Sequence, residues 1–242
     1  MSTAGVSFSV IGHAAWAPGL SARETWVDWA QAPWPIGPQG EPGVVAMPAM
    51  QRRRLGQLGK MALEVGYECL GTATDVPTVF CSRHGETSRA VALLGDLVRG
   101  EPLSPTAFGM SVHNATTGMF SIARADRANH VALAAGTSTL EHAVIDACGL
   151  LADGAPRVLL IACDTPLPEV FADFADRVEQ PHAFAWLMAP GAGLRLDWEA
   201  APGEEVAGGA PGSLDVLRFF LAEQASLERV AERRRWRWTR AL

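Results

Sequence analysis

The chain has 242 residues, of which 48% are hydrophobic and 19% are charged, and its formal net charge is −6. This composition is typical of a globular protein with a buried core and excludes a disordered chain. The negative charge and the lack of a nucleic-acid-binding motif also argue against a nucleic-acid partner.

Apolar strands and amphipathic helices alternate along most of the sequence. Between the first strand and Pro48, a loop rich in tryptophan is expected to pack down as an ordered cover. In the helix over 86–99, Val91, Leu94 and Val98 are expected to face the core. The alternation predicts an α/β sheet with helices on both sides. In chain order we expect a strand at 6–11, a helix at 52–70, a strand at 76–81, helices at 86–99 and 111–123, a strand at 131–135, a helix at 138–152, a strand at 158–163 and a hairpin over 183–198.

The carboxyl-terminal part differs in composition from the rest. We expect one domain over 1–200, a linker rich in glycine and proline over 201–212, and an amphipathic basic helix over 213–242. The end of this helix carries Arg234, Arg235, Trp236 and Arg237. These side chains are either cations at a helix carboxyl end beside packed indoles, or a docking site for an acidic carrier protein or other partner.

No segment of the sequence indicates export or a membrane span. The start of the chain lacks a basic stretch followed by an apolar one, and no run reaches about eighteen apolar residues. The cysteines form no C-x-x-C pair and lie far apart in largely apolar segments, at Cys69, Cys81, Cys148 and Cys163. We therefore predict a cytoplasmic protein with buried free thiols, without metal or other cofactor.

Three segments carry a family resemblance. The string SPTAFGMSVHNATTGMFSI over 104–122 resembles the amino-terminal domain of β-ketoacyl synthases, in the short chain length factor form of aryl polyene and type II polyketide clusters. The helix that follows Pro48 and the strand and turn over 78–86 resemble the same family. The resemblance covers roughly 6–200. It implies a thiolase-like, ketosynthase-like fold with the first half largely complete and the second truncated, a heterodimer with a ketosynthase partner, and substrates carried on acyl carrier protein.

The departures from the family concern its chemistry. Active members carry a cysteine nucleophile at a sharp strand-to-helix turn, where a helix amino terminus stabilises the thiolate. The resemblance places this position at Gly136, which leaves it degenerate. Nearby Ser138 has the S-x-x-E spacing of a capping box with Glu141, which favours an N-cap over a nucleophile. No histidine follows His182 to drive malonyl decarboxylation, so a self-sufficient condensing enzyme is not expected.

The first hypothesis is therefore a non-condensing subunit that pairs with an active β-ketoacyl synthase in polyene or fatty-acid-like biosynthesis. In the family, the region that matches 104–122 lies near the subunit interface. Its bulky residues Phe108, Met110 and Met119 are accordingly candidates for setting the depth of an acyl tunnel.

A second hypothesis belongs to a different class, a small acyl hydrolase or acyltransferase. Its site combines Ser82 or Ser111 as nucleophile, His113 as base and Asp164 as the orienting acid. Buried polar groups that fix loops are the favoured interpretation of the same residues. A homodimeric scaffold without an acyl ligand is the third possibility.

Overall fold

We describe a computed structural model of the chain in which residues 4–201 and 208–241 are placed. Residues 202–207, half of the predicted linker over 201–212, therefore lie outside the described residues. The strands are β1 Ala4–Trp16, β2 Thr78–Cys81, β3 His130–Leu133, β4 Val158–Asp164, β5 His182–Ala200, β6 Ser226–Ala231 and β7 Arg234–Arg240. The helices are α1 Arg23–Gln31, α2 Ala49–Arg52, α3 Gln57–Leu70, α4 Thr87–Arg99, α5 Pro105–Gly109, α6 Ala115–Arg124, α7 Thr139–Ala152 and α8 Gly212–Leu221, with 3-10 turns η1 Gly136–Ser138 and η2 Glu169–Phe174.

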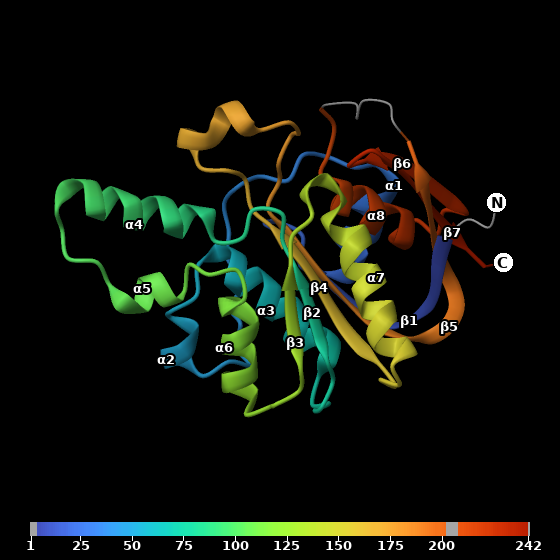
Figure 1. The fold of residues 1–242 in the computed structure, drawn as a ribbon, viewed down its shortest axis with the longest axis horizontal. Coiled ribbons are helices and arrows are strands. Elements are labelled where there is room, and N and C mark those ends of the chain that lie inside the picture. Colours follow the sequence, from blue (N-terminus) through green and yellow to red (C-terminus); the bar gives the residue numbers. More distant parts are fainter. Residues whose placement is uncertain (1–3, 202–207, 242) are drawn as a thin grey trace.

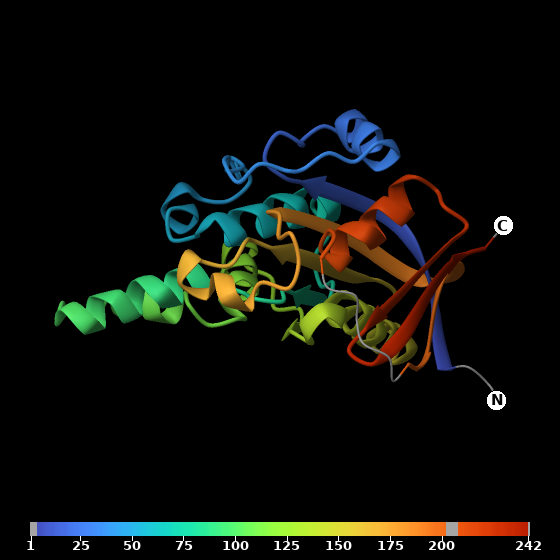
Figure 2. The ribbon, with the colours of Figure 1, turned by 90° about the horizontal axis from the view of Figure 1, so that it is seen from above.

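The described strands form one mixed sheet in the order β3-β2-β4-β5-β7-β6, and β1 also pairs with β5. Strands β3, β2 and β4 are parallel, whereas β5 runs antiparallel to β1, β4 and β7. Helix α3 covers one face of this sheet and α7 the other (Figures 1 and 2). The predicted α/β sheet with helices on both sides is therefore confirmed.

Strand β4 shows why the sheet is covered on both faces. Its side chains alternate between two apolar clusters: Leu160 packs on the side of α7, and Leu159 and Ile161 pack on the side of α3. All three are fully buried. A strand buried on both faces reads as a continuous apolar run, and this run is what predicted β4 from the sequence.

The carboxyl-terminal segment differs from its prediction. Helix α8 ends at Leu221, and β6 and β7 then form a hairpin that joins the sheet beside β5. A single helix was expected because Leu214, Leu217 and Leu221 recur at helical spacing. Beyond them the pattern changes to alternation, with Trp236 and Trp238 both buried on one side of β7. The period of two, which is typical of a strand, therefore takes over after the helix.

Helix α4 projects away from the sheet at the left of Figure 1, with α5 beside it. It contains no buried residue. Leu94 and Val98, which were expected to face the core, are 56% and 87% exposed. That prediction was wrong because periodicity identifies an apolar face but not what covers it. The first predicted helix is also divided, since the chain leaves helical geometry between α2 and α3.

Candidate functional site

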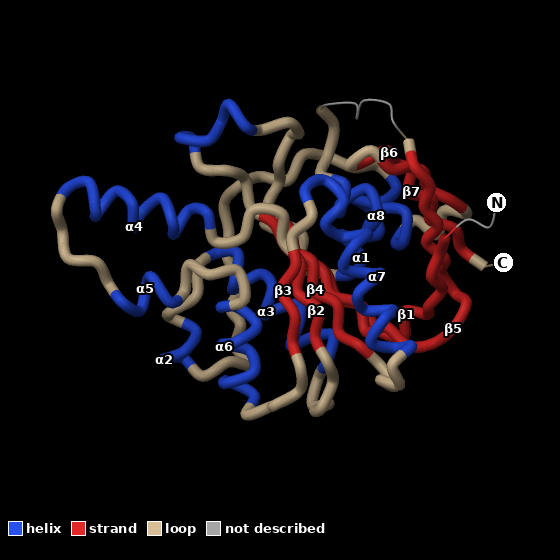
Figure 3. The backbone as a smooth tube through the Cα atoms, viewed as in Figure 1, coloured by secondary structure: helices blue, strands red, loops and turns tan. Residues whose placement is uncertain are grey.

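Three of the predicted site residues lie at one edge of the sheet. Parallel strands end on the same edge, so the loops after β2, β3 and β4 meet there (Figure 3). Ser82 follows β2, Gly136 lies in the turn after β3, and Asp164 ends β4. The structure therefore brings these three positions to the same end of the sheet.

The Asp164 carboxylate holds the turn that follows β2. Its Oδ1 accepts hydrogen bonds from the Ser82 hydroxyl at 2.8 Å and from the Arg83 amide at 2.8 Å. The Ser82 hydroxyl in turn accepts from the amide of Gly85 at 2.8 Å. Ser82 is fully buried. These contacts give Ser82 and Asp164 a structural role in fixing the turn.

The histidine of the hydrolase hypothesis does not face a hydroxyl nucleophile. His113 Nε2 lies 2.9 Å from the backbone carbonyl oxygen of Ser82, not from its hydroxyl. Ser111 donates its hydroxyl hydrogen bond to the Phe108 carbonyl at 2.8 Å. A Ser-His-Asp triad requires the base to contact the nucleophile and the acid to contact the base. The structure brings Ser82 to Asp164 directly and places the imidazole elsewhere.

His182 is a further buried histidine at this edge that sequence reasoning did not assign. Its Nδ1 donates to the Gln180 carbonyl at 2.7 Å, and its Nε2 accepts from the Ser213 hydroxyl at 2.7 Å. Burial lowers the pKa of His182, which fits the neutral ring that these two contacts need. The two ring nitrogens therefore connect the loop before β5 to the start of α8.

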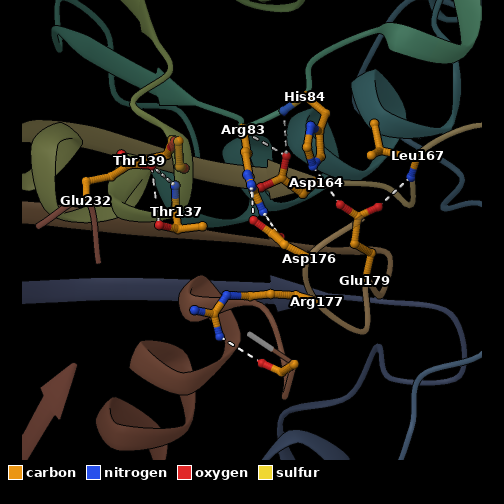
Figure 4. A network of polar contacts seen from close by, with 12 residues as sticks. Arg83, His84, Thr137, Thr139, Asp164, Leu167, Asp176, Arg177, Glu179 and Glu232 are labelled. Carbon is orange, nitrogen blue, oxygen red and sulfur yellow. Dashed lines mark hydrogen bonds and ion pairs between the residues drawn. The ribbon is translucent and has the colours of Figure 1, made fainter. Parts of the chain in front are cut away.

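A cleft opens beside these residues, between the start of α7 and the loop over 165–181. An ion pair and a hydrogen bond connect the loop to the turn after β2 (Figure 4). Arg83 donates to both carboxylate oxygens of Asp176 at 2.7 Å, and this contact lowers the pKa of Asp176. His84 Nε2 lies 2.6 Å from Glu179 Oε1. Burial alone would raise the pKa of Glu179, but its hydrogen-bond partners outweigh burial and hold it below the ordinary value.

The turn at Gly136, which the sequence resemblance aligned with the family's nucleophile, forms part of the cleft wall. Gly136 adopts a left-handed conformation with φ of 57°. The carboxylate of Glu232, from the turn between β6 and β7, accepts a hydrogen bond from the Thr137 amide at 3.0 Å (Figure 4). Sequence reasoning missed Glu232, because no local pattern relates two positions so far apart in the chain.

The start of α7 is not stabilised by the expected capping box. Ser138 donates its hydroxyl to the Ala135 carbonyl at 3.1 Å and makes no side-chain cap. Glu141 instead forms a buried ion pair with Arg229 of β6. Glu141 Oε1 also lies 3.5 Å from the Trp238 indole nitrogen. The S-x-x-E spacing was therefore a misleading signal, since the glutamate serves a contact between α7 and the carboxyl-terminal hairpin.

The predicted docking cluster near the carboxyl terminus forms part of the sheet. Trp236 is 1% exposed, so its indole belongs to the core. Arg235 pairs with Glu199 and Glu228, and Arg237 pairs with Glu228, each at 3.1 Å. Arg234 is exposed at the start of β7. Trp236 is thus unavailable to a partner, and the other three positions were wrongly placed at a helix end.

The three proposed tunnel residues separate into two groups. Met110 and Met119 are buried and belong to the apolar cluster on the α3 side of the sheet. Phe108 is 63% exposed on α5. Of the three, only Phe108 has a side chain that is mostly exposed.

All four cysteines are free thiols with raised pKa values. Burial raises the pKa of Cys69 and of Cys148 to about 12, and raises those of Cys81 and Cys163 well above the ordinary value. Activated cysteine nucleophiles have lowered pKa values, so these thiols do not resemble one. Within 4–201 and 208–241, no cluster of ligating side chains fits a metal ion. In the same residues, no helix is long and apolar enough to span a membrane.

Comparison with known proteins gives a consistent result. The family described as "Beta-ketoacyl synthase, N-terminal domain" matches residues 26–239. A chain from the solved complex of the ketosynthase ApeO with its chain length factor ApeC, from Xenorhabdus doucetiae, has a TM-score of 0.87 and 28% identity, over 97% of this chain and 100% of that one. No curated protein matches the sequence.

Two further solved structures share the fold at lower identity. A chain of the ishigamide ketosynthase/chain length factor has a TM-score of 0.65 and 14% identity, over 82% of this chain and 68% of that one. A chain of the AntDE:AntF complex, a type II polyketide synthase acyl-carrier protein with its ketosynthase bound to the hexaketide, has a TM-score of 0.67 and 9% identity, over 99% and 100%. The predicted thiolase-like, ketosynthase-like α/β fold is confirmed by these likenesses.

Proposed function

This chain belongs to the family of β-ketoacyl synthase N-terminal domains, and from this premise we propose that it is a non-condensing subunit of the chain length factor type. It pairs with an active β-ketoacyl synthase that elongates an acyl chain in polyene or fatty-acid-like biosynthesis. The feature that supports the proposal is the turn after β3, where the family resemblance aligns Gly136 with the nucleophile position. Without a nucleophile at this turn, the chain does not itself catalyse condensation, and its role is to complete the partner subunit that does.

The thiols of the chain support the non-condensing role. Covalent acyl transfer by a cysteine needs a thiolate that is accessible and stabilised by its surroundings. Cys81 and Cys163 are buried within β2 and β4, and burial raises their pKa values. Neither thiol therefore replaces the missing nucleophile.

The surface around β3 supports the pairing. Strand β3 is an edge strand of the sheet, so its outer side offers unpaired backbone groups to another strand. Helix α6 contacts β3, and α5 lies beside α4. These three helices and the turn between α5 and α6 carry large exposed apolar side chains, and such a concentration marks a protein interface. They are Leu94, Leu97, Val98, Phe108, Val112 and Ile122. We assign this face, which we call the β3 face, to the ketosynthase partner.

Acyl carrier protein is the proposed substrate carrier of the assembled complex. One structure of the same fold contains an acyl-carrier protein with its ketosynthase. The arginines near the carboxyl terminus give little support to a contact with this chain itself, since Arg235 and Arg237 already pair with carboxylates. We therefore place carrier protein docking on the partner.

Phe108 is the residue of this chain that we propose reaches the acyl tunnel. It lies on the β3 face and its ring is mostly exposed in the isolated chain. Met110 and Met119 fill the core of this chain, so they support the segment without facing the partner. In this proposal the Phe108 ring limits the length of the acyl product.

The test is co-purification with a β-ketoacyl synthase from the same genome, native mass determination and an elongation assay with acyl carrier protein. We expect a one-to-one complex whose activity depends on this chain. Leu97→Asp is expected to abolish the complex, because it places a charge on the β3 face. Ile11→Asp is the matched control: Ile11 is 59% exposed on β1, away from that face, against 58% for Leu97. A stable lone homodimer beside an unaffected ketosynthase would refute the proposal.

A further inference from the structure

The turn between β6 and β7 has an unusual backbone. Ala231 pairs with Arg234, so Glu232 and Arg233 form a two-residue hairpin loop. Both have positive φ values, 51° and 61°. Such loops normally use glycine, asparagine or aspartate, because other side chains are strained in the left-handed region. Strain of this kind persists where the surrounding contacts hold it in place, and it is often found at functional positions.

The hairpin is fixed against the start of α7 by Arg229. Besides its buried ion pair with Glu141, Arg229 donates from Nη2 to the Thr137 carbonyl at 3.2 Å. The guanidinium also needs the space left by Gly212, where an added Cβ would lie 1.7 Å from Nη2. The position of the hairpin relative to the turn at Gly136 is therefore set by several contacts.

Held in this way, the hairpin loop carries a carboxylate into the turn. Glu232 Oε1 accepts from the Thr137 amide at 3.0 Å and lies 3.4 Å from the Thr137 hydroxyl. A Cβ added to Gly136 would lie only 1.8 Å from the same oxygen and 2.7 Å from Cδ of Glu232. The glutamate therefore occupies the space of a side chain at the nucleophile position. It also accepts the hydrogen bond of the Thr137 amide, a backbone donor of the kind that stabilises negative charge at such turns.

We propose that Glu232 is an internal carboxylate that fills the acyl site of this chain and keeps acyl thioesters out of it. The inference rests on the proposed function and extends it. Loss of the cysteine alone would leave an open turn with a donor available to a thioester carbonyl. The carboxylate closes that turn, so the growing acyl chain is held only by the partner subunit.

The test restores a thiol at the turn and measures whether Glu232 shields it. Iodoacetamide is applied to the full-length chain with Gly136→Cys, alone and combined with Glu232→Ala, and alkylation of residue 136 is followed by peptide mass spectrometry. The native thiols react slowly, because burial raises the pKa of Cys69 and of Cys148 to about 12. The strain of a left-handed cysteine is common to both variants and cancels in the comparison.

We expect alkylation to be about tenfold faster in the double variant, since an adjacent carboxylate raises a thiol pKa by about one unit and also blocks access. Gly136→Cys combined with Glu228→Ala is the matched control, because Glu228 is a carboxylate of the same hairpin that pairs with Arg235 and Arg237. This control is expected to react like the single variant. Equal rates in the single variant and in the Glu232→Ala double variant would overturn the proposal.

A second measurement covers the case in which Gly136→Cys does not fold. Gly136→Ala is expected to lower the midpoint of thermal unfolding more in the wild-type background than in the Glu232→Ala background, where the close contact is absent. An equal decrease in both backgrounds would overturn the proposal. Both measurements use this chain alone, so their failure leaves the pairing proposal intact. Failed co-purification likewise leaves these results unaffected.

Discussion

Replacing Arg229 by methionine removes the cation from the ion pair that joins the carboxyl-terminal hairpin to α7. The side chains of Arg229 and Glu141 are 7% and 0% exposed, so the glutamate would remain as a charge inside the protein. Methionine keeps much of the apolar volume of the arginine stem. The variant therefore tests the charge and its hydrogen bonds more than the packing.

The expected loss of stability is about 3–5 kcal/mol, the usual cost of removing one partner of a buried pair. Arg237→Met is the matched control, since Arg237 lies in the same hairpin but its pair with Glu228 is about half exposed on both sides. Its expected cost is about 0–1 kcal/mol. The double replacement of Arg229 by methionine and Glu141 by leucine is expected to recover most of the loss, because no charge is then left unpaired.

Urea unfolding, followed by tryptophan fluorescence, measures the free energy of unfolding of each variant. The comparison requires that the dependence of this free energy on urea concentration has the same slope in all variants. Circular dichroism on the same samples checks that the two probes report a single transition. A loss for Arg229→Met no greater than that of the Arg237→Met control would refute the buried ion pair. A double variant as unstable as the single one would refute the explanation by an unpaired charge.

Three further outcomes follow from the site. The chain is expected not to react with a serine-directed fluorophosphonate, because the Ser82 hydroxyl is buried and donates to Asp164; labelling that disappears in Ser82→Ala would contradict this. Asp176→Asn is expected to reduce stability by up to about 1 kcal/mol at neutral pH, the scale of an exposed pair. The contact with Arg83 lowers the pKa of Asp176 in the folded protein. The stability that this contact contributes is therefore fully present above pH 3.8, the ordinary pKa, and is lost as the pH falls through the folded pKa. A difference in thermal unfolding between wild type and Asp176→Asn that does not change with pH would contradict this. Phe108→Ala is expected to lengthen the acyl product of the assembled complex without changing the stability of the chain, as measured by product mass and thermal unfolding; an unchanged product length would remove Phe108 from the tunnel.

The sequence predicts elements well where local pattern and environment agree. The continuous apolar run of β4 and the helical periodicity of α7 are both local signals, and both elements formed. The inward face of α4 was mispredicted because its pattern suits a partner protein as well as a core. The carboxyl-terminal hairpin was mispredicted because the helical pattern of α8 was extended past the point where alternation begins.

The candidate site was predictable only in part. Ser82 and Asp164 follow strands that end on the same edge, so their contact follows from the topology. The contacts of Arg229 with Glu141 and of Glu232 with Thr137 join positions far apart in the sequence. Such contacts depend on how β7 pairs with β5 and β6, and no local periodicity encodes that pairing. The family resemblance likewise identified the turn at Gly136 but not what fills it.

Strand β5 has a consequence for the order in which the chain folds during synthesis. It pairs with β1 near the start of the chain, as in Phe8 with Leu194, and with β7 near its end, as in Leu194 with Arg240. During synthesis, strand β1 therefore cannot pair with β5 until most of the chain has been made. Pairings over such sequence distances are slow to form and leave apolar edges open to aggregation in the meantime. Nascent chains that stall before β7 are accordingly the species that a chaperone would have to protect.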